Sequence, residues 1–222
     1  MNVEGGATAS PRPDPSVRTS RDSGPHPQLT PVVKLSAAEL GKLTELFESL
    51  TLPTRQRKVV RGASTSLGLH RVGGTSDLAI DTLDGSASQL LTYLNGLTRK
   101  CADRLGRVPV TSWAVNYNTW SSKHRDQGWS YYISTADYTG GELITEDDVL
   151  IDARGLMGLF DGARQHANNP KLTGVRITFV GFAHHLLGQA DDTLRAGLRS
   201  LGFPILVDDF DSAPAGGPSA AR

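Results

Sequence analysis

The sequence predicts a mostly β domain with flanking helices, and three observations support this fold class. From Val108 onward, short runs rich in β-branched and aromatic residues follow one another. Turn residues such as Gly140-Gly141 and Asp161-Gly162 separate these runs. Earlier in the chain, two segments carry apolar residues at helical spacing. Short strands spaced this closely are typical of a β-sandwich or barrel rather than of a parallel α/β sheet.

The two ends of the chain lack the residues of a hydrophobic core. Residues 1–30 are rich in proline, glycine, serine and threonine and contain few large apolar side chains. Such a segment buries too little surface to offset its ordering entropy, so we expect it to be disordered. The tail 212–222 has the same composition. The sequence therefore predicts one ordered domain over residues 31–211.

The helices are expected before and after the β-rich region. Ser36 and Glu39 have the spacing of a capping box, and leucines at helical intervals follow them as far as Leu50. A second helix is expected over residues 88–105, where Cys101 lies on the apolar stripe and is interpreted as a packing residue. A short helix within residues 190–202 and a strand within residues 204–210 are expected to close the domain.

The charge of the chain gives no support to binding driven by a global electrostatic field. There are 23 basic and 23 acidic side chains, so the formal net charge is zero. One local run contains Arg55, Arg57, Lys58 and Arg61. This run is either a contact for nucleic acid or a solvated charged edge, and the sequence leaves both interpretations open.

The sequence predicts a soluble, intracellular protein of the cytoplasm or nucleus. No apolar run approaches the roughly 20 residues of a membrane-spanning helix, so no membrane partner is expected. The first residues contain no apolar segment of the kind found in secretory signals. Cys101 is the single cysteine and cannot form an internal disulfide, which fits a reducing compartment.

His124 and Asp126 are two residues apart, just ahead of an aromatic-rich run. With Arg125 between them they read "HRD", but the asparagine that follows the aspartate in a kinase catalytic loop is missing, and the chain is too short for two kinase lobes. In an extended backbone, residues i and i+2 point to the same side. The imidazole and the carboxylate can then bind one metal ion; the alternative is a polar turn in which the carboxylate orients the imidazole.

His166 is the candidate for a third ligand, because two protein ligands are too few for a tight metal site. It follows the strand-like run "GLMGLFDG" and precedes the last long predicted strand. Two histidines and one carboxylate on one face of an ion form the donor set of the non-haem Fe(II) oxygenases.

Arg176 lies within that last predicted strand, in "GVRITFVGF". Alternation along a strand places Arg176 and Thr178 on one face. A charge within so apolar a segment is costly to bury unless it meets an anion, and a guanidinium suits a carboxylate. The anion is either one end of a bound dicarboxylate or a protein side chain such as Asp152 or Glu142.

The ordered set His124, Asp126, His166, Arg176 and Thr178 resembles the Fe(II)/2-oxoglutarate-dependent dioxygenases. "SYYIST" and "DYTGGELIT" are similar to strands and a Gly-Gly turn of prolyl-hydroxylase-type members. The compact motif order, with "GG", "FDG" and then a histidine, also resembles the branch that oxidises methylated pyrimidines in DNA. The resemblance covers about residues 108–185. It implies a double-stranded β-helix (jelly-roll) core over that span.

The resemblance also implies site roles and cofactors. Iron would be held by His124, Asp126 and His166. The far carboxylate of 2-oxoglutarate would be held by Arg176 and Thr178, with Tyr132 and Asn116 as further contacts to this cosubstrate. Tyr132 is alternatively a core residue. The cofactors implied are Fe(II), 2-oxoglutarate and O₂, with ascorbate as a candidate reductant.

The implied reaction is hydroxylation of a C–H bond with release of succinate and CO₂. The neutral charge favours a protein side chain or a small molecule as substrate; the alternatives are a modified base in nucleic acid and a non-catalytic β-barrel module that has kept the motif. Trp120 and Trp129 either line the substrate pocket or pack near it, and the sequence does not indicate an oligomeric state. His184 and His185 are interpreted as a surface strand end.

Overall fold

The structure is a computed structural model, and it describes residues 26–50, 60–73, 75, 77–81, 83–135 and 137–205, without the side chains of Val60 and Arg61. The helices within these residues are α1 (Ala37–Glu48), α2 (Gly85–Leu105), α3 (Asp192–Ser200) and the short 3-10 helix Leu187–Gln189. The strands are β1 (Leu29–Lys34), β2 (Val60–Arg71), β3 (Leu78–Ile80), β4 (Ser112–Ser121), β5 (Trp129–Ser134), β6 (Tyr138–Gly140), β7 (Leu143–Ile144), β8 (Leu150–Ile151), β9 (Leu156–Asp161), β10 (Ala167–Asn168), β11 (Leu172–Gly174) and β12 (Ile177–Phe182).

The strands form one large sheet and two small ones. The large sheet has seven strands in the order β1-β9-β5-β12-β4-β2-β3, and its neighbours pair antiparallel. The small sheets are β10-β7-β8 and β11-β6. Strands far apart in sequence lie side by side, as β12 does between β4 and β5. This arrangement confirms the predicted mostly β class with flanking helices and a jelly-roll core.

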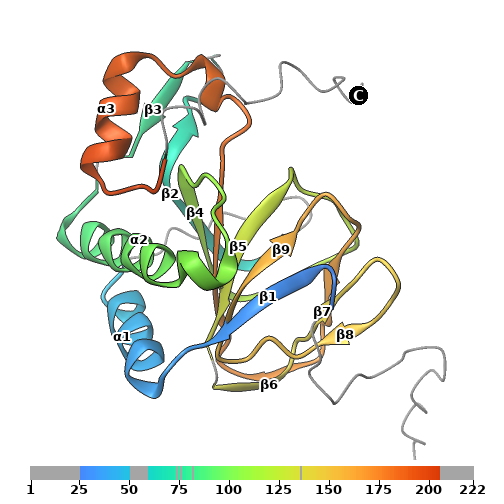
Figure 1. Cartoon of the computed structure of the whole chain (residues 1–222). Helices are drawn as coiled ribbons and strands as arrows, with labels where there is room; N and C mark the ends of the chain where they lie inside the picture. Colours follow the sequence, from blue (N-terminus) through green and yellow to red (C-terminus); the bar gives the residue numbers. More distant parts are fainter. Residues whose placement is uncertain are drawn as a thin grey trace, which may run out of the picture.

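Alternation along the central strands divides the large sheet into two faces. Ile177 and Phe179 of β12, like Trp113 and Val115 of β4, are buried in the main hydrophobic core together with leucines of α1 and α2. Figure 1 shows these two helices on the same side of the sheet, with α3 beside β3. The residues in between point away from the helices, and they form the wall of the cavity described below.

The two helices form as their sequences predict. Ser36 accepts from the Glu39 backbone N–H, and the Glu39 carboxylate accepts from the Ser36 N–H, which completes the capping box of α1. α2 begins at Gly85, three residues before the predicted start, because Asp84 accepts from the Ala87 N–H as its N-cap. Cys101 is buried in the core, as predicted.

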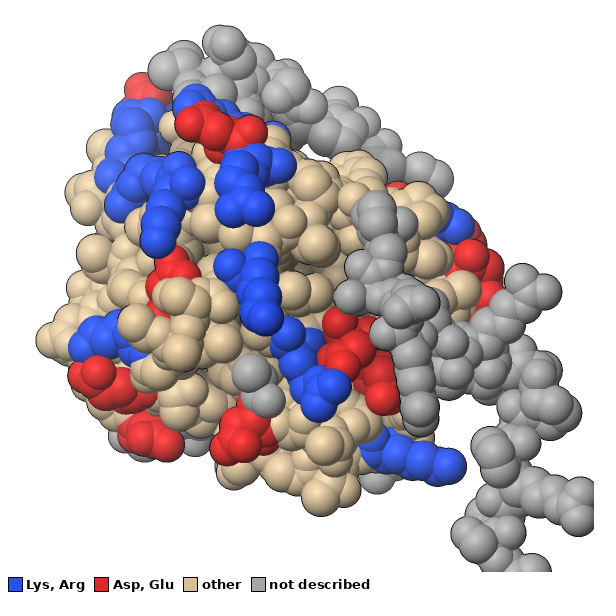
Figure 2. Space-filling view, turned by 60° about the horizontal axis from the view of Figure 1, so that its bottom comes forward, with Lys and Arg blue, Asp and Glu red and all other residues tan. Residues whose placement is uncertain are grey.

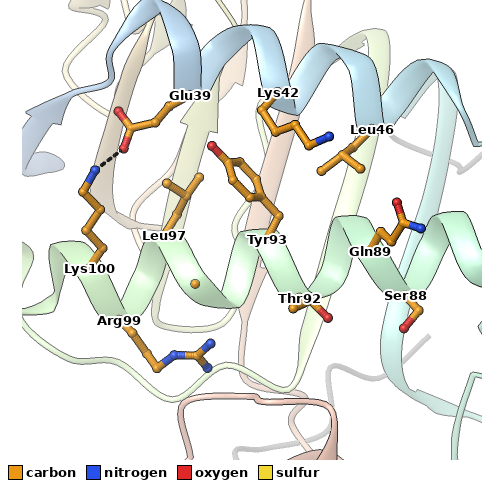
Figure 3. Close-up of a pocket in the computed structure, with 11 residues that line it drawn as sticks. Glu39, Lys42, Leu46, Ser88, Gln89, Thr92, Tyr93, Leu97, Arg99 and Lys100 are labelled. Carbon is orange, nitrogen blue, oxygen red and sulfur yellow. Dashed lines mark hydrogen bonds and ion pairs between the residues drawn. The ribbon is translucent and has the colours of Figure 1, made fainter.

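Glu39 also joins α1 to α2, since its carboxylate lies 2.7 Å from the Lys100 ammonium (Figure 3). The hydrogen bond from Lys100, followed by those from Ser36, lowers the Glu39 pKa from 4.5 to about 2. A pKa lowered by folding stabilises the fold above the unfolded pKa, and this stabilisation is lost as the pH falls toward the folded pKa.

We therefore expect Glu39→Gln to lower the free energy of unfolding by about 1 kcal/mol at pH 7. The difference from the wild type should shrink between pH 5 and pH 3, and urea unfolding at each pH measures it. Glu45→Gln is the control, because Glu45 pairs with Lys42 inside the same helix and ties nothing to α2. A Glu39→Gln deficit that stays constant down to pH 3 would contradict the assignment.

Three parts of the structure differ from the sequence prediction. Order begins earlier than residue 31, because Gln28 and Leu29 are buried and β1 starts at Leu29. Strands β2 and β3 were not predicted; β2 contains serine, threonine and glycine, and it pairs with β4 along most of its length. Residues 204 and 205 of the predicted last strand are not in a strand. Residues 1–25, 55–58, 206–211 and 212–222, on which other predictions fall, lie outside the described residues.

Among the described helices, none combines the length and the apolar character needed to cross a bilayer.

Candidate metal centre

His124 and His166 are brought together by a pair of backbone hydrogen bonds. The N–H of each residue donates to the carbonyl of the other at 2.9 Å, which makes an isolated antiparallel bridge. Residues paired in this way carry their side chains on the same side of the ladder. The two imidazole rings accordingly lie 4.3 Å apart between centroids.

Asp126 faces both rings from the same segment as His124. One carboxylate oxygen lies 3.8 Å from His124 Nε2 and 3.5 Å from His166 Nε2. Its backbone N–H donates to the Gly162 carbonyl at 2.8 Å, and a Cβ at Gly162 would lie 3.1 Å from the Cβ of Asp126. A glycine at this position thus leaves the room that the aspartate side chain occupies. As the sequence predicts, the three candidate ligands lie together, with one ligand atom of each within 4.8 Å of the others.

Backbone carbonyls determine which nitrogen of each ring is free to bind an ion. His124 Nδ1 lies 2.7 Å from the Ser122 carbonyl, and His166 Nδ1 lies 3.0 Å from the Arg164 carbonyl. A carbonyl only accepts, so Nδ1 carries the hydrogen in both rings. The lone pairs of both Nε2 atoms then point to the side of Asp126. Metal-ligating histidines are commonly oriented in this way, by a hydrogen bond from the ring nitrogen that does not bind the metal.

A cavity of about 450 Å³ opens beside these three residues. Its wall is the face of the large sheet turned away from the helices, together with β7 and β10 of a small sheet. The lining residues include Ala114, Asn116, Thr119, Ser121, His124, Arg125, Asp126, Gln127, Ser130, Tyr132, Leu143, Phe160, His166, Asn168, Val180, Phe182, Ala183 and His185. This volume lies within the range of roughly 300–1,000 Å³ typical of small-molecule sites.

Arg176 is buried behind this cavity and has no anionic partner among the described residues. Its side chain is 1 % exposed, and its two terminal nitrogens donate to the carbonyls of Gly141 and Thr119. Its Nε has no hydrogen-bond partner within the described part of the chain. A buried guanidinium without a counter-charge is unfavourable, and the described residues supply no carboxylate to balance this one.

The predicted protein partners of Arg176 are occupied elsewhere. Asp152 pairs with Arg154, whose Nε lies 2.8 Å from it, and the Glu142 carboxylate accepts from Asn169 at 2.8 Å. The alternative of a structural ion pair with Asp152 or Glu142 is therefore wrong.

The other predicted cosubstrate residues lie on the cavity side of the sheet. Asn116 and Tyr132 line the cavity, and the Asn116 amide donates to the Thr178 hydroxyl at 3.3 Å. Burial raises the pKa of Tyr132, although the nearby Arg176 charge acts in the opposite direction. Tyr131 faces the other way and donates to the Gly106 carbonyl at 2.8 Å. Tyr132, still a neutral O–H donor at pH 7, is thus the tyrosine that meets the cavity, as predicted.

Sequence reasoning missed two residues near this site. Tyr138 is buried with its ring centroid 5.9 Å from the Arg176 guanidinium carbon, and it hydrogen-bonds Ser134 at 2.7 Å. Burial raises its pKa. His185, interpreted from sequence as part of a surface strand end, lines the cavity. A tyrosine just before the Gly-Gly turn was the available signal for Tyr138, and the adjacent pair His184-His185 was the signal for His185.

Trp113, Trp120 and Trp129 have different roles from one another. Trp113 is fully buried in the main core, as predicted, and its indole N–H donates to Asn95 at 2.9 Å. Trp120 and Trp129 are 37 % and 43 % exposed, and neither is among the cavity-lining residues given above.

A second hollow, of about 640 Å³, lies between α1 and α2 on the helical side of the sheet (Figure 3).

Similarity to known proteins is found in the fold and not in the sequence. No protein-family model matches the chain, and a search of curated proteins finds no match. Among solved structures, an oxidoreductase of the 2OG-Fe(II) oxygenase family from Burkholderia pseudomallei matches with a TM-score of 0.51 and 18% identity, over 68% of this chain and 82% of that one. The chain has the 2OG-Fe(II) oxygenase fold.

Two other structures match this 2OG-Fe(II) oxygenase fold more loosely. NgTET1, in complex with 5mC DNA, matches at 20% identity over 71% of this chain and 72% of its own, with a TM-score of 0.48. The viral collagen prolyl hydroxylase of Paramecium Bursaria Chlorella virus-1, in a 2OG complex, matches at 12% identity over 69% and 96%, with a TM-score of 0.40. Alignments this loose carry no argument about the substrate of the present chain.

Proposed function

We propose that this protein is an Fe(II)- and 2-oxoglutarate-dependent dioxygenase that hydroxylates a C–H bond of a protein side chain or small molecule. The observation that carries the proposal is a set of three candidate metal ligands in one cavity, together with a buried arginine that donates to the carbonyl of the cavity-lining Thr119. His124, Asp126 and His166 offer three donor atoms to a metal ion and would leave its other coordination positions open. Arg176 offers a buried positive charge to an anion that the described residues do not supply. A diacid that binds the metal ion with one end can place its other carboxylate against Arg176.

The donor set fits Fe(II). Two neutral imidazoles and one carboxylate, with open positions on the ion, are typical of non-haem Fe(II) oxygenases. The three donor atoms are separated by up to 4.8 Å. Donor atoms this close together belong to side chains that would hold a single ion.

Side chains that line the cavity, and Arg176 and Thr178 next to it, would share the binding and orientation of the cosubstrate. Arg176 would pair with the far carboxylate of 2-oxoglutarate, and the Tyr132 and Thr178 hydroxyls and the Asn116 amide would contact the same cosubstrate. Phe160, Leu143 and Val180 line the cavity with apolar surface that excludes water. Fe(II) with 2-oxoglutarate, held by these residues, would supply the activation of O₂; one oxygen atom would enter the hydroxylated substrate and the other succinate, with loss of CO₂.

The substrate class rests on the size and charge of the molecule. The cavity of about 450 Å³ has to hold the cosubstrate and the reacting group, which leaves room for a fragment of side-chain size. The formal net charge is zero, and Lys and Arg side chains lie next to Asp and Glu on the face that Figure 2 shows. A modified base in nucleic acid stays the alternative, without a specific observation in its favour.

Succinate formation tests the proposal directly. Purified protein with Fe(II), ascorbate and 2-oxoglutarate should form succinate even without substrate, and His124→Ala should reduce this to background. His70→Ala is the matched control, because His70 pairs with Asp81 and is not among the cavity-lining residues. Metal binding by the wild type without succinate, with or without a panel of peptides and small molecules, would favour the non-catalytic binding module.

A further inference from the structure

Gln28 is a fully buried polar residue that lies just before β1, outside the span that carries the site motifs. Its exposure is 0 %, and its backbone carbonyl accepts from the Asp161 N–H at 2.9 Å. Asp161 ends β9, the strand that leads to His166. The N-terminal segment thus lies against the chain that carries one of the candidate iron ligands.

The side-chain amide of Gln28 joins two loops. Its nitrogen lies 3.3 to 3.4 Å from the carbonyls of Asp161, Arg164 and Gln165, and its oxygen accepts from the Glu146 N–H at 3.0 Å. Three carbonyls only accept and a backbone N–H only donates, so the surroundings determine the orientation of the amide. A side chain without both a donor and an acceptor cannot make these contacts.

One of these carbonyls also orients His166. The Arg164 carbonyl accepts from Gln28 and from His166 Nδ1, which lies 3.0 Å away. The Gln28 amide therefore holds in place the Arg164 carbonyl, and this carbonyl keeps the hydrogen of the His166 ring on Nδ1. Such outer contacts of a ligating histidine tune metal affinity.

Glu146 extends this support to the other ligand segment. Its carboxylate lies 2.8 Å from Arg125 Nη2 and 3.1 Å from Arg164 Nε. Arg125 stands between His124 and Asp126, and Arg164 stands two residues before His166. The carboxylate thus bridges both segments that carry the candidate ligands, and Gln28 holds the backbone from which that carboxylate extends.

We propose that Gln28 is a positioning residue of the metal centre, which acts through the Arg164 carbonyl and through Glu146 to hold the two ligand segments in register. This inference rests on the proposed function, because it assigns a role toward the ion that His124, Asp126 and His166 would hold.

Binding of Co(II) alone to the full chain tests the proposal without turnover. Gln28→Leu keeps the approximate volume and removes the amide. We expect its Kd for Co(II) to rise about 10- to 100-fold, with an altered visible absorption of the bound Co(II) and a smaller rise in Tm on addition of the metal. Glu146→Gln changes a partly exposed side chain and should weaken Co(II) binding by a smaller factor. This variant replaces Gln28→Leu in the test if Gln28→Leu does not fold.

The matched control is Asn95→Leu. Asn95 is an equally buried amide, but it donates to Leu201 and accepts from Trp113 on the helical side of the sheet. Both leucine variants should lower the Tm of the metal-free protein, and only Gln28→Leu should lose Co(II) affinity.

The outcomes separate the two proposals. Wild-type Co(II) affinity and spectrum in Gln28→Leu, or in Glu146→Gln where the first does not fold, overturn the positioning role alone. An equal loss in Asn95→Leu also overturns it, because the effect would then be general destabilisation. A wild type that binds no Co(II) overturns the metal site and this inference with it.

Discussion

Replacing Arg176 by methionine is expected to abolish useful binding of 2-oxoglutarate while the ligand-free protein stays folded. Removal of one partner of a buried charge pair costs about 2–5 kcal/mol. Since 1.4 kcal/mol is a factor of ten, the Kd for 2-oxoglutarate should rise at least ~30-fold. In the ligand-free protein, the loss of the hydrogen bonds to Gly141 and Thr119 is offset by removal of a buried charge to which the described part of the chain gives no anion.

Thermal unfolding with and without 2-oxoglutarate, in the presence of Co(II), measures this effect. A ligand that binds the folded state raises Tm, so the wild type should gain Tm from 2-oxoglutarate and Arg176→Met should not. Arg154→Met is the control, because Arg154 is partly exposed and pairs with Asp152. If Arg176→Met still gains Tm from 2-oxoglutarate as the wild type does, the guanidinium is structural and the cosubstrate site is wrongly assigned.

Replacing Asp126 by asparagine should remove most of the affinity for divalent metal without loss of stability. The substitution keeps the shape of the side chain and removes the single negative charge among the three candidate ligands. We expect a loss of Co(II) affinity larger than the 10- to 100-fold typical of residues behind the ligands. The Asp126 side chain is 58 % exposed, so the Tm of the metal-free protein should change little.

Asp148→Asn provides a closely matched control for this substitution. The Asp148 side chain is also 58 % exposed, and it pairs with Lys123 at 2.5 Å, in the segment just before His124. Its φ of 61° is one that asparagine also adopts readily. Calorimetric titration with Co(II) should find wild-type affinity in Asp148→Asn. A similar affinity in Asp126→Asn would mean that Asp126 is not a ligand.

Much of the site could be predicted because local patterns place its residues. The two-residue spacing of His124 and Asp126 puts both on one side of an extended segment, and both line the cavity. Strand alternation places Thr178 opposite Asn116 in the register of β12 with β4, and the two side chains hydrogen-bond. The same alternation separates Tyr132 from Tyr131 across the sheet.

The missed parts depend on contacts between residues far apart in sequence. β2 has no alternating apolar pattern of its own, and its pairing with β4 supplies the backbone hydrogen bonds that make it a strand. Gln28 looked like part of a polar tail, because the groups that its amide contacts lie more than 100 residues away and most are backbone carbonyls. Backbone groups are the same for every residue type, so no sequence pattern announces them.

The sequence by itself determined the mostly β class and the two amphipathic helices, and it singled out His124, Asp126 and His166 as the residues of the proposed metal centre. Periodicity carries this information because buried side chains recur every second residue along a strand and every three or four residues along a helix. Only the tertiary structure decided that His166 meets His124 through a backbone bridge, that Arg176 is buried without an anionic partner among the described residues, and that Gln28 contacts the loop before His166. These facts depend on which segments the fold places side by side, and local spacing does not encode that choice.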